Sequence, residues 1–344
     1  MDERMKQVAE NGDITALHQL IGEDVNLLDR VDQVPRVQTP LHIAASTGHI
    51  QFAMEMMGLK PSFARKLNLD GFSPIHLALQ YGHIELVRRL LQLDEDLVRV
   101  KGREWLTPLH YVVESGEHLY LLEEFLLVCP DSITDVTVRN ETALHIALKN
   151  EKLEAFKFFV GWLANNSSKI AKFNQRRVLN WKENEGNTVL HILVSKNQTD
   201  DVRHFLSWCK EFLDVNLKNL EDKTAWDILR EDNREIRDML SHAGAKPGSS
   251  LYTFNRYPNP KYQRLPSTVA FRPRDFRSEI REITVEGRNM FLVEFGKIMS
   301  KIKRRKWHSS VEDDDDHGGF VIVSGSGSTS SRKKESLQRT VSLK

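Results

Sequence analysis

The stretch Thr39-Pro40-Leu41-His42-Ile43-Ala44-Ala45 decides the fold, because copies of it return along the chain. The first residues of the copies are Thr39, Ser73, Thr107, Thr142, Thr188 and Thr224. These residues are separated by 34, 34, 35, 46 and 36 positions. Five copies keep the polar first residue, the apolar third residue and the histidine, whereas the sixth carries Trp226 and Asp227 instead of leucine and histidine. So many copies in register indicate a protein built from repeats.

Each residue of the repeated stretch suits the start of a helix. Threonine or serine accepts a hydrogen bond from a free backbone N–H in the first turn, and proline fits next because that N–H would be unpaired anyway. The period and the Thr-Pro-Leu-His-x-Ala stretch resemble the ankyrin repeat. The resemblance predicts an all-α ankyrin-repeat solenoid of helix-turn-helix repeats with short β-hairpin fingers. No repeat can bury its apolar face alone, so we expect stacking to supply the core.

The repeated histidines are expected to be structural, each hydrogen-bonding to the adjacent turn. They lie about one repeat apart, and no cysteine or carboxylate cluster accompanies them, which argues against a metal site. These residues are His42, His76, His110, His145 and His191.

Composition excludes several classes of protein. The 49 basic and 48 acidic residues nearly cancel, so net charge gives no indication of nucleic-acid binding. Two cysteines cannot form a disulfide framework, which fits a reducing compartment. The charged N-terminus lacks the apolar core of a signal peptide. No uncharged apolar run reaches 18 residues, so no transmembrane span is predicted, and we expect a cytoplasmic protein.

The chain divides into four parts. Residues 1–246 are predicted to form the ankyrin-repeat domain, with about six to seven repeats including the terminal caps. Residues 247–278 read as a linker rich in proline and tyrosine, 279–307 as a basic amphipathic helix, and 308–344 as a largely disordered tail. The interval between Thr142 and Thr188 is about a dozen residues too long. We expect this excess to extend an outer helix and add a surface loop.

Several segments of residues 1–246 resemble the plant ankyrin-repeat membrane proteins of the accelerated-cell-death and Bian Da type. They are 52–56, 60–68, 98–104, 161–163 and 178–180. The resemblance implies a non-enzymatic role in plant immune signalling at the plasma membrane.

Members of this family continue into a C-terminal domain of several membrane helices, opened by Arg-Asn-x-x-Leu-Val. The sequence Arg288-Asn289-Met290-Phe291-Leu292-Val293 resembles that opening, but Glu294-Phe295-Gly296-Lys297 follows in place of an apolar run. The sequence therefore predicts a relative without the membrane domain.

No catalytic constellation emerges from the sequence. There is no glycine-rich phosphate loop after a strand, no His-Glu-x-x-His motif and no paired Cys-x-x-Cys motif. We therefore expect no enzymatic activity, no cofactor and no metal.

Binding in ankyrin arrays generally uses the concave face of the inner helices and the finger tips. Tyr81 and Trp105 are the strongest candidates, because exposed aromatic residues are enriched in binding hot spots. Two alternatives remain at this stage: ordinary solvated surface, and packing of Trp105 back onto Leu106. The predicted protein-binding residues are Thr47, Gln80, Tyr81, Trp105, Glu114, Lys149, Asn150 and Lys196.

Residues 288–307 form a basic segment with seven lysines and arginines against one glutamate. Its apolar residues recur at helical spacing, which is typical of a calmodulin target or a helix that lies on an anionic membrane surface. The run 301–306 also resembles a nuclear import signal, and a solvated helix without a partner is a further alternative. The candidate residues are Phe291, Phe295, Ile298, Lys301, Ile302, Arg304, Arg305 and Trp307.

Ser342 is a candidate phosphorylation site. Leu337 and Arg339 precede it by five and three positions, a spacing that resembles substrates of calcium-dependent protein kinases. A phosphate there would add negative charge close to the basic segment. The alternative is that Ser342 is one of many serines in a disordered end.

The sequence therefore predicts a non-enzymatic scaffold that binds unidentified proteins in plant immune or stress signal transduction. One alternative is a plasma-membrane-associated signalling component like the membrane-embedded relatives. A nuclear transcription cofactor is a second alternative, suggested only by the basic run.

Overall fold

The computed structural model describes residues 2–165, 169–230 and 232–251, with the side chains of 169–173 excluded. The predicted basic helix and tail, and the linker beyond residue 251, lie outside the described residues. Within them the secondary structure is helical, and the pairing of extended chain is limited to one isolated bridge between Arg36 and Leu67. The all-α class predicted from the repeats is confirmed.

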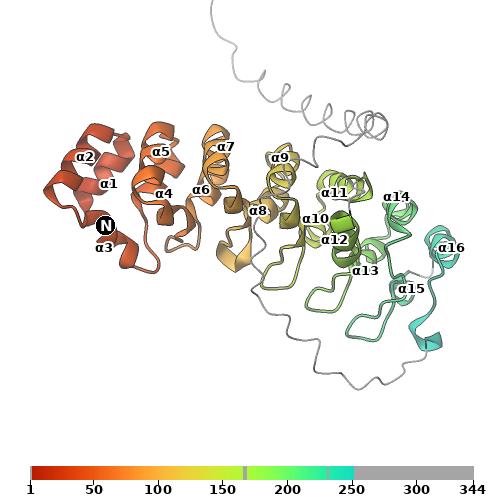
Figure 1. Ribbon diagram of the computed structural model, residues 1–344. Helices are drawn as coiled ribbons and strands as arrows, with labels where there is room; N and C mark the ends of the chain where they lie inside the picture. Colours follow the sequence, from red (N-terminus) through yellow and green to blue (C-terminus); the bar gives the residue numbers. More distant parts are fainter. Residues whose placement is uncertain (1, 166–168, 231, 252–344) are drawn as a thin grey trace, which may run out of the picture. The chain divides into compact units, whose positions relative to one another are not determined.

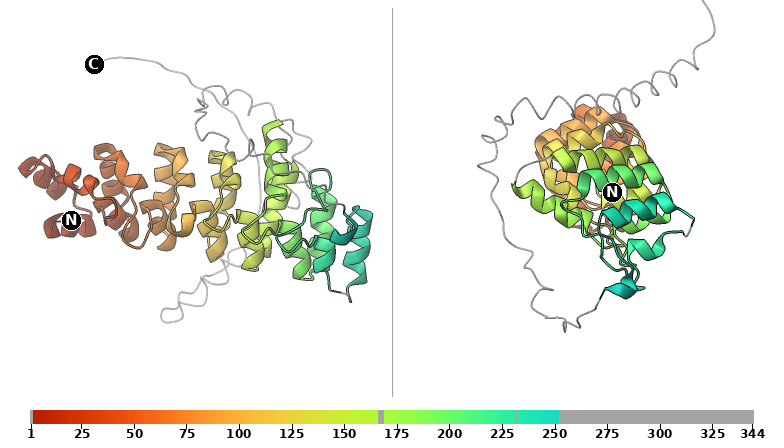
Figure 2. Two further views of the ribbon diagram at one scale, coloured as in Figure 1. Left: turned by 90° about the horizontal axis from the view of Figure 1, so that it is seen from below. Right: turned by 90° about the vertical axis from the view of Figure 1, so that its right-hand side faces the viewer.

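Helices come in pairs that follow one another along a row (Figure 1). The same neighbours lie side by side in two further views (Figure 2). The first helix of each pair is called the inner helix; from α4 onward it begins at a copy of the repeated stretch, whereas α1 begins after Asp2 without such a copy. The inner helices are α1 (Glu3–Asn11), α4 (Pro40–Thr47), α6 (Pro74–Gln80), α8 (Pro108–Ser115), α10 (Ala143–Lys149), α13 (Val189–Ser195) and α15 (Ala225–Ile228).

The second helix of each pair is the outer helix. The outer helices are α2 (Ile14–Glu23), α5 (Ile50–Leu59), α7 (Ile84–Leu93), α9 (Leu121–Val128), α11 (Leu153–Asn165), α14 (Thr199–Cys209) and α16 (Arg234–His242). Two helices stand outside this pairing, α3 (Leu27–Gln33) and α12 (Lys169–Leu179). Short 3-10 turns follow several outer helices or enter fingers: η1 (Pro61–Arg65), η2 (Glu95–Arg99), η3 (Arg103–Trp105), η4 (Pro130–Thr134) and η5 (Gly248–Ser250).

The repeated histidine links α4, α6 and α13 to the next repeat, whereas Nε2 of His110 and His145 has no hydrogen-bond partner among the described residues. Thr39 accepts a hydrogen bond from the backbone N–H of His42, and the backbone N–H of Thr39 donates to His42 Nδ1 at 3.1 Å. Because Nδ1 is the acceptor, Nε2 carries the proton and donates to the carbonyl of Phe72 at 3.0 Å. His76 and His191 donate in the same way to the carbonyls of the following fingers. The structural role predicted for the histidines agrees with this geometry.

The core lies between successive helix pairs, as stacking requires. Leu41, Leu109 and Leu144 of the inner helices are fully buried. Outer helices contribute Phe52, Phe159 and further aromatic residues to the same continuous core.

The fingers are tight turns, each closed by one backbone hydrogen bond across four residues. Asn68 N–H donates to the carbonyl of Phe72 at 2.8 Å, and the later fingers repeat this bond. From the third finger onward, neighbouring tips are also joined, for example from Val138 N–H to the carbonyl of Glu104 at 3.0 Å. The predicted hairpin turns are therefore present, although the described fingers are too short to form strands.

The long interval between Thr142 and Thr188 forms a helix where we expected a loop. The extension of the outer helix is confirmed, since α11 has 13 residues and α5 and α7 have 10. Residues 169–179 of the insertion form α12, a helix where the prediction had a surface loop. Val178 and Leu179 at the end of α12 are buried, and Asn174 donates to Asp131 of the preceding repeat at 2.9 Å. Packing onto η4 thus orders the inserted residues.

Asp227 takes the place of the histidine in the last repeat. Its Oδ2 accepts from the backbone N–H of Thr224 and from the backbone N–H of Gly248, both at 2.8 Å. A Cβ on Gly248 would lie 2.6 Å from the carbonyl oxygen of Asp222, so only glycine fits there without a shift. This position therefore still contacts the segment that follows the repeat, as an acceptor where the histidines are donors.

Candidate protein-binding surface

Apart from Trp105, which lies at a finger tip in η3, the predicted binding residues lie along one row at the C-terminal ends of the inner helices. Because the inner helices stack side by side, residues at equivalent ends become neighbours across repeats. Thr47 and Gln80 end their helices, Tyr81 and Asn150 follow theirs, and Glu114 precedes the last residue of α8. Lys149 and Lys196 hold corresponding places on α10 and α13.

Tyr81 and Trp105 are the large exposed side chains among the predicted residues. Tyr81 is 57% exposed and Trp105 is 51% exposed. The Nζ atom of Lys101 lies 4.4 Å from the centroid of the Trp105 ring, a cation–π contact that holds the indole at the finger tip. The predicted alternative of packing onto Leu106 would leave less of the ring in solvent.

The finger that carries Trp105 has an unusual backbone. Glu104 and Trp105 both adopt the left-handed conformation, with φ of 54° and 61°. Gly71 and Gly186 adopt this conformation in other fingers, at no steric cost. The carbonyl of Glu104 is bonded to the next finger, and its carboxylate pairs with Arg139. The next finger thus holds the strained turn.

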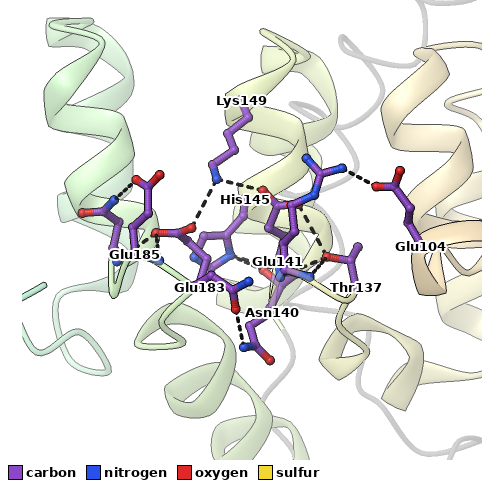
Figure 3. A network of polar contacts seen from close by, with 12 residues as sticks. Glu104, Thr137, Asn140, Glu141, His145, Lys149, Glu183 and Glu185 are labelled. Carbon is purple, nitrogen blue, oxygen red and sulfur yellow. Dashed lines mark hydrogen bonds and ion pairs between the residues drawn. The ribbon is translucent and has the colours of Figure 1, made fainter. Parts of the chain in front are cut away.

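Lys149 joins two fingers through buried carboxylates (Figure 3). Its Nζ lies 2.8 Å from Glu141 and 3.3 Å from Glu183, whose side chains are 9% and 2% exposed. Backbone N–H groups of Glu185 and Asn187 donate to Glu183, each at 3.1 Å. Although burial opposes ionisation, these donors and Lys149 hold the pKa of Glu183 below its ordinary value. The ammonium group of Lys149 is thus paired with these two carboxylates, and chiefly the aliphatic part of its side chain faces the surface.

Glu114 has no such partner. The described residues form no ion pair with its carboxylate, which lies in an exposed position on α8. Burial, followed by the nearby charge of Glu104, raises the pKa of Glu114 above its ordinary value. This carboxylate is therefore the uncompensated charge in the middle of the row.

Sequence reasoning missed Tyr111, which lies one helical turn before Glu114 on the same face of α8. Its ring packs edge-on against Phe72 and His76, at centroid distances of 6.5 Å and 6.2 Å. The sequence does contain a signal for Tyr111, because it is aromatic where the other repeats have an aliphatic residue. Those residues are Ile43, Leu77, Ile146 and Ile192.

The remaining predicted residues contribute less distinctive chemistry. The hydroxyl of Thr47 donates to the carbonyl of Ile43 at 3.0 Å, and Lys196 lies 3.4 Å from Glu151. Gln80 and Asn150 are exposed.

The calmodulin or lipid candidates between Phe291 and Trp307 and the candidate phosphorylation site Ser342 lie outside the described residues. In the described part of the chain, no helix has the length and apolar character needed to cross a membrane.

Comparison with known proteins agrees with the repeat pattern. A family model of ankyrin repeats, in three copies, matches residues 5–101. The ankyrin repeat-containing protein BDA1 of Arabidopsis thaliana is 42% identical over 268 residues, which cover 75% of this chain and 62% of the relative. This chain is an ankyrin-repeat protein of the BDA1 family. It spans less than two thirds of the length of BDA1.

Two solved structures are similar to this chain. The ankyrin repeat domain of Bcl-3, a member of the IkappaB protein family, aligns with a TM-score of 0.52 and 21% identity. That alignment covers 70% of this chain and 98% of the Bcl-3 domain. An ankyrin repeat domain from Acinetobacter baumannii aligns with a TM-score of 0.48 and 22% identity, over 60% of this chain and 98% of that domain. At this level of identity the Bcl-3 domain supports the ankyrin fold alone.

Proposed function

We propose that this BDA1-family chain is a non-enzymatic scaffold that binds other proteins in plant immune or stress signalling. The single observation that carries the proposal is the pair of exposed aromatic side chains, Tyr81 and Trp105, held by rigid backbone on the inner-helix and finger face. Rigid, exposed aromatic residues lose little entropy on binding, which suits them to anchor a partner. The immune role rests on the resemblance to the Bian Da proteins.

Two features favour the inner-helix and finger face, and not the outer helices, as the binding surface. The finger tips are joined to one another by backbone hydrogen bonds from Glu104 onward, so the surface is preorganised. The outer helices also carry exposed apolar residues, such as Leu127, but these occur singly at helix ends. Isolated exposed apolar residues are ordinary on protein surfaces.

The test is affinity capture from plant extract with the full chain as bait. A Tyr81→Ser/Trp105→Ser double variant should lose most of the captured partners, because both anchors are removed without disturbing the core. Leu127→Ser is the matched control, since Leu127 is 71% exposed on the outer helix α9. If both variants capture the same partners as the original chain, this face is not the binding surface.

A further inference from the structure

Two cations close to Glu114 are engaged elsewhere, and a third, Arg103, acts on Glu114 through its charge without forming an ion pair with it. Lys149 is its neighbour in the row and would be the natural partner, but Glu141 and Glu183 hold its Nζ at 2.8 and 3.3 Å. Arg139 lies close enough to affect Glu114, yet its guanidinium pairs with Glu104. Figure 3 shows Lys149 between its two carboxylates. The array therefore leaves one carboxylate available at this point.

The charge around Glu114 is negative. Four carboxylates, those of Glu104, Glu117, Glu141 and Glu183, face the three cations Arg103, Arg139 and Lys149, so one negative charge remains besides Glu114. Burial raises the pKa of the Tyr111 hydroxyl, and the charges of Glu117 and Glu114 raise it further. Such a field attracts a cation and repels a phosphate or a carboxylate.

Aromatic residues lie on the same face of the array as this carboxylate. The ring of Tyr111 packs edge-on to Phe72, with an interplanar angle of 86°, and it lies on the face of α8 that carries Glu114. Tyr81 directly follows the neighbouring helix α6. At the adjacent finger tip the contact between Lys101 and Trp105 already provides a cation–π pair. A carboxylate next to aromatic rings is a chemistry that recognises arginine and lysine side chains.

We propose that Tyr81, Trp105, Tyr111 and Glu114, named here the Glu114 surface, bind an arginine- or lysine-containing segment of a partner protein. The cation pairs with the Glu114 carboxylate, and the flanking aromatic rings pack on its aliphatic stem. This proposal rests on the proposed scaffold function and adds the chemical class of the partner segment. Charge complementarity selects this occupant over a phosphorylated or acidic segment.

The experiment uses labelled peptides of about twelve residues, built from glycine, serine and leucine with arginine at set positions. Companion peptides carry lysine, citrulline or glutamate at those positions. Fluorescence anisotropy with the full chain should show the arginine or lysine peptides binding roughly tenfold or more tightly than the citrulline and glutamate peptides. Citrulline keeps the shape of arginine and removes its charge, so this pair isolates the charge.

Variants then locate the site. Glu114→Gln should remove most of the preference for arginine over citrulline, and Glu114→Lys should abolish it. Glu95→Lys, at an exposed position after the outer helix α7, makes the same change in net charge and should keep the preference. Circular dichroism confirms folding of each variant. If Glu95→Lys weakens binding as much as Glu114→Lys, the attraction is general and the Glu114 surface is not a site.

The two proposals can fail separately. If citrulline and arginine peptides bind equally and the Tyr81→Ser/Trp105→Ser variant binds neither, the scaffold surface stands and the cationic partner is wrong. If the double variant captures the same partners from extract as the original chain, the scaffold surface itself is wrong.

Discussion

At the scale of single residues, the repeated histidines act as neutral hydrogen-bonding links. Burial lowers the pKa of His42, His76, His110 and His145 to about 4. A protonated ring would have to give up the acceptor role of Nδ1 toward the cap, as the bond from Thr39 to His42 illustrates. The folded state therefore requires the neutral form.

This requirement makes stability depend on pH. An unfolded histidine binds its proton near pH 6.5, whereas the folded ones do so near pH 4. Between these values the unfolded state binds more protons, so the free energy of unfolding should fall as pH drops from 6.5 to 4, and stay constant above this range. In the His76→Gln variant, the slope of the free energy of unfolding against pH should decrease between pH 5 and 6 by about 1 kcal/mol per pH unit.

Urea titrations of the full chain at several pH values measure this slope. His204→Gln, which removes a histidine at an exposed position of α14, is the matched control. An unchanged slope in His76→Gln would mean that His76 titrates alike in the folded and unfolded states, contrary to its burial.

At the scale of elements, the fingers show what the repeat pattern predicts and what it does not. Helix starts and the inner-helix register follow from the Thr-Pro-Leu-His stretch, because they depend on residues within one repeat. The histidine links are also predictable, although they reach the next repeat, because their acceptor is a backbone carbonyl. The partners of Lys149 cannot be predicted from this stretch, since they are the side chains of Glu141 and Glu183, which lie 8 and 34 positions away. The helix α12 was missed for a similar reason, because its packing partner η4 belongs to the preceding repeat.

The left-handed turn at Glu104 and Trp105 leads to a prediction about stability. Glycine adopts this conformation freely, so Trp105→Gly should raise the free energy of unfolding by about 0.5–1 kcal/mol. Leu220→Gly is the control, because Leu220 is an exposed finger-tip residue outside the left-handed set. Glycine there should lower stability by a few tenths to about 1 kcal/mol. A loss of stability in Trp105→Gly, seen by chemical denaturation, would show that the indole and Lys101 stabilise the fold.

At the scale of the whole molecule, stability is close to a sum of repeats and the interfaces between them. Lys149 holds the interface between α10 and α13 through two nearly buried carboxylates. Lys149→Met would leave these carboxylates without their cation, so it should lower the free energy of unfolding by about 1–3 kcal/mol. Hydrogen exchange should accelerate first in the fingers at 137–141 and 183–187.

Lys196→Met is the matched control for that prediction. Its partner Glu151 has a side chain that is 78% exposed, so loss of the pair should cost less than about 1 kcal/mol. Adding Glu183→Gln to Lys149→Met should restore part of the stability, because one buried charge is removed. Equal losses from Lys149→Met and Lys196→Met would mean that burial of the two carboxylates adds nothing to the interface.

Asp227 in the last repeat determines how further repeats can be added to the array. Histidines such as His42 present an N–H to a carbonyl of the following finger, whereas Asp227 presents a lone pair to the N–H of Gly248. A repeat grafted after Lys246 would bring a carbonyl to position 227, where two oxygen acceptors repel. Lengthening the protein by design therefore requires Asp227→His at the old end and an aspartate in the new terminal repeat.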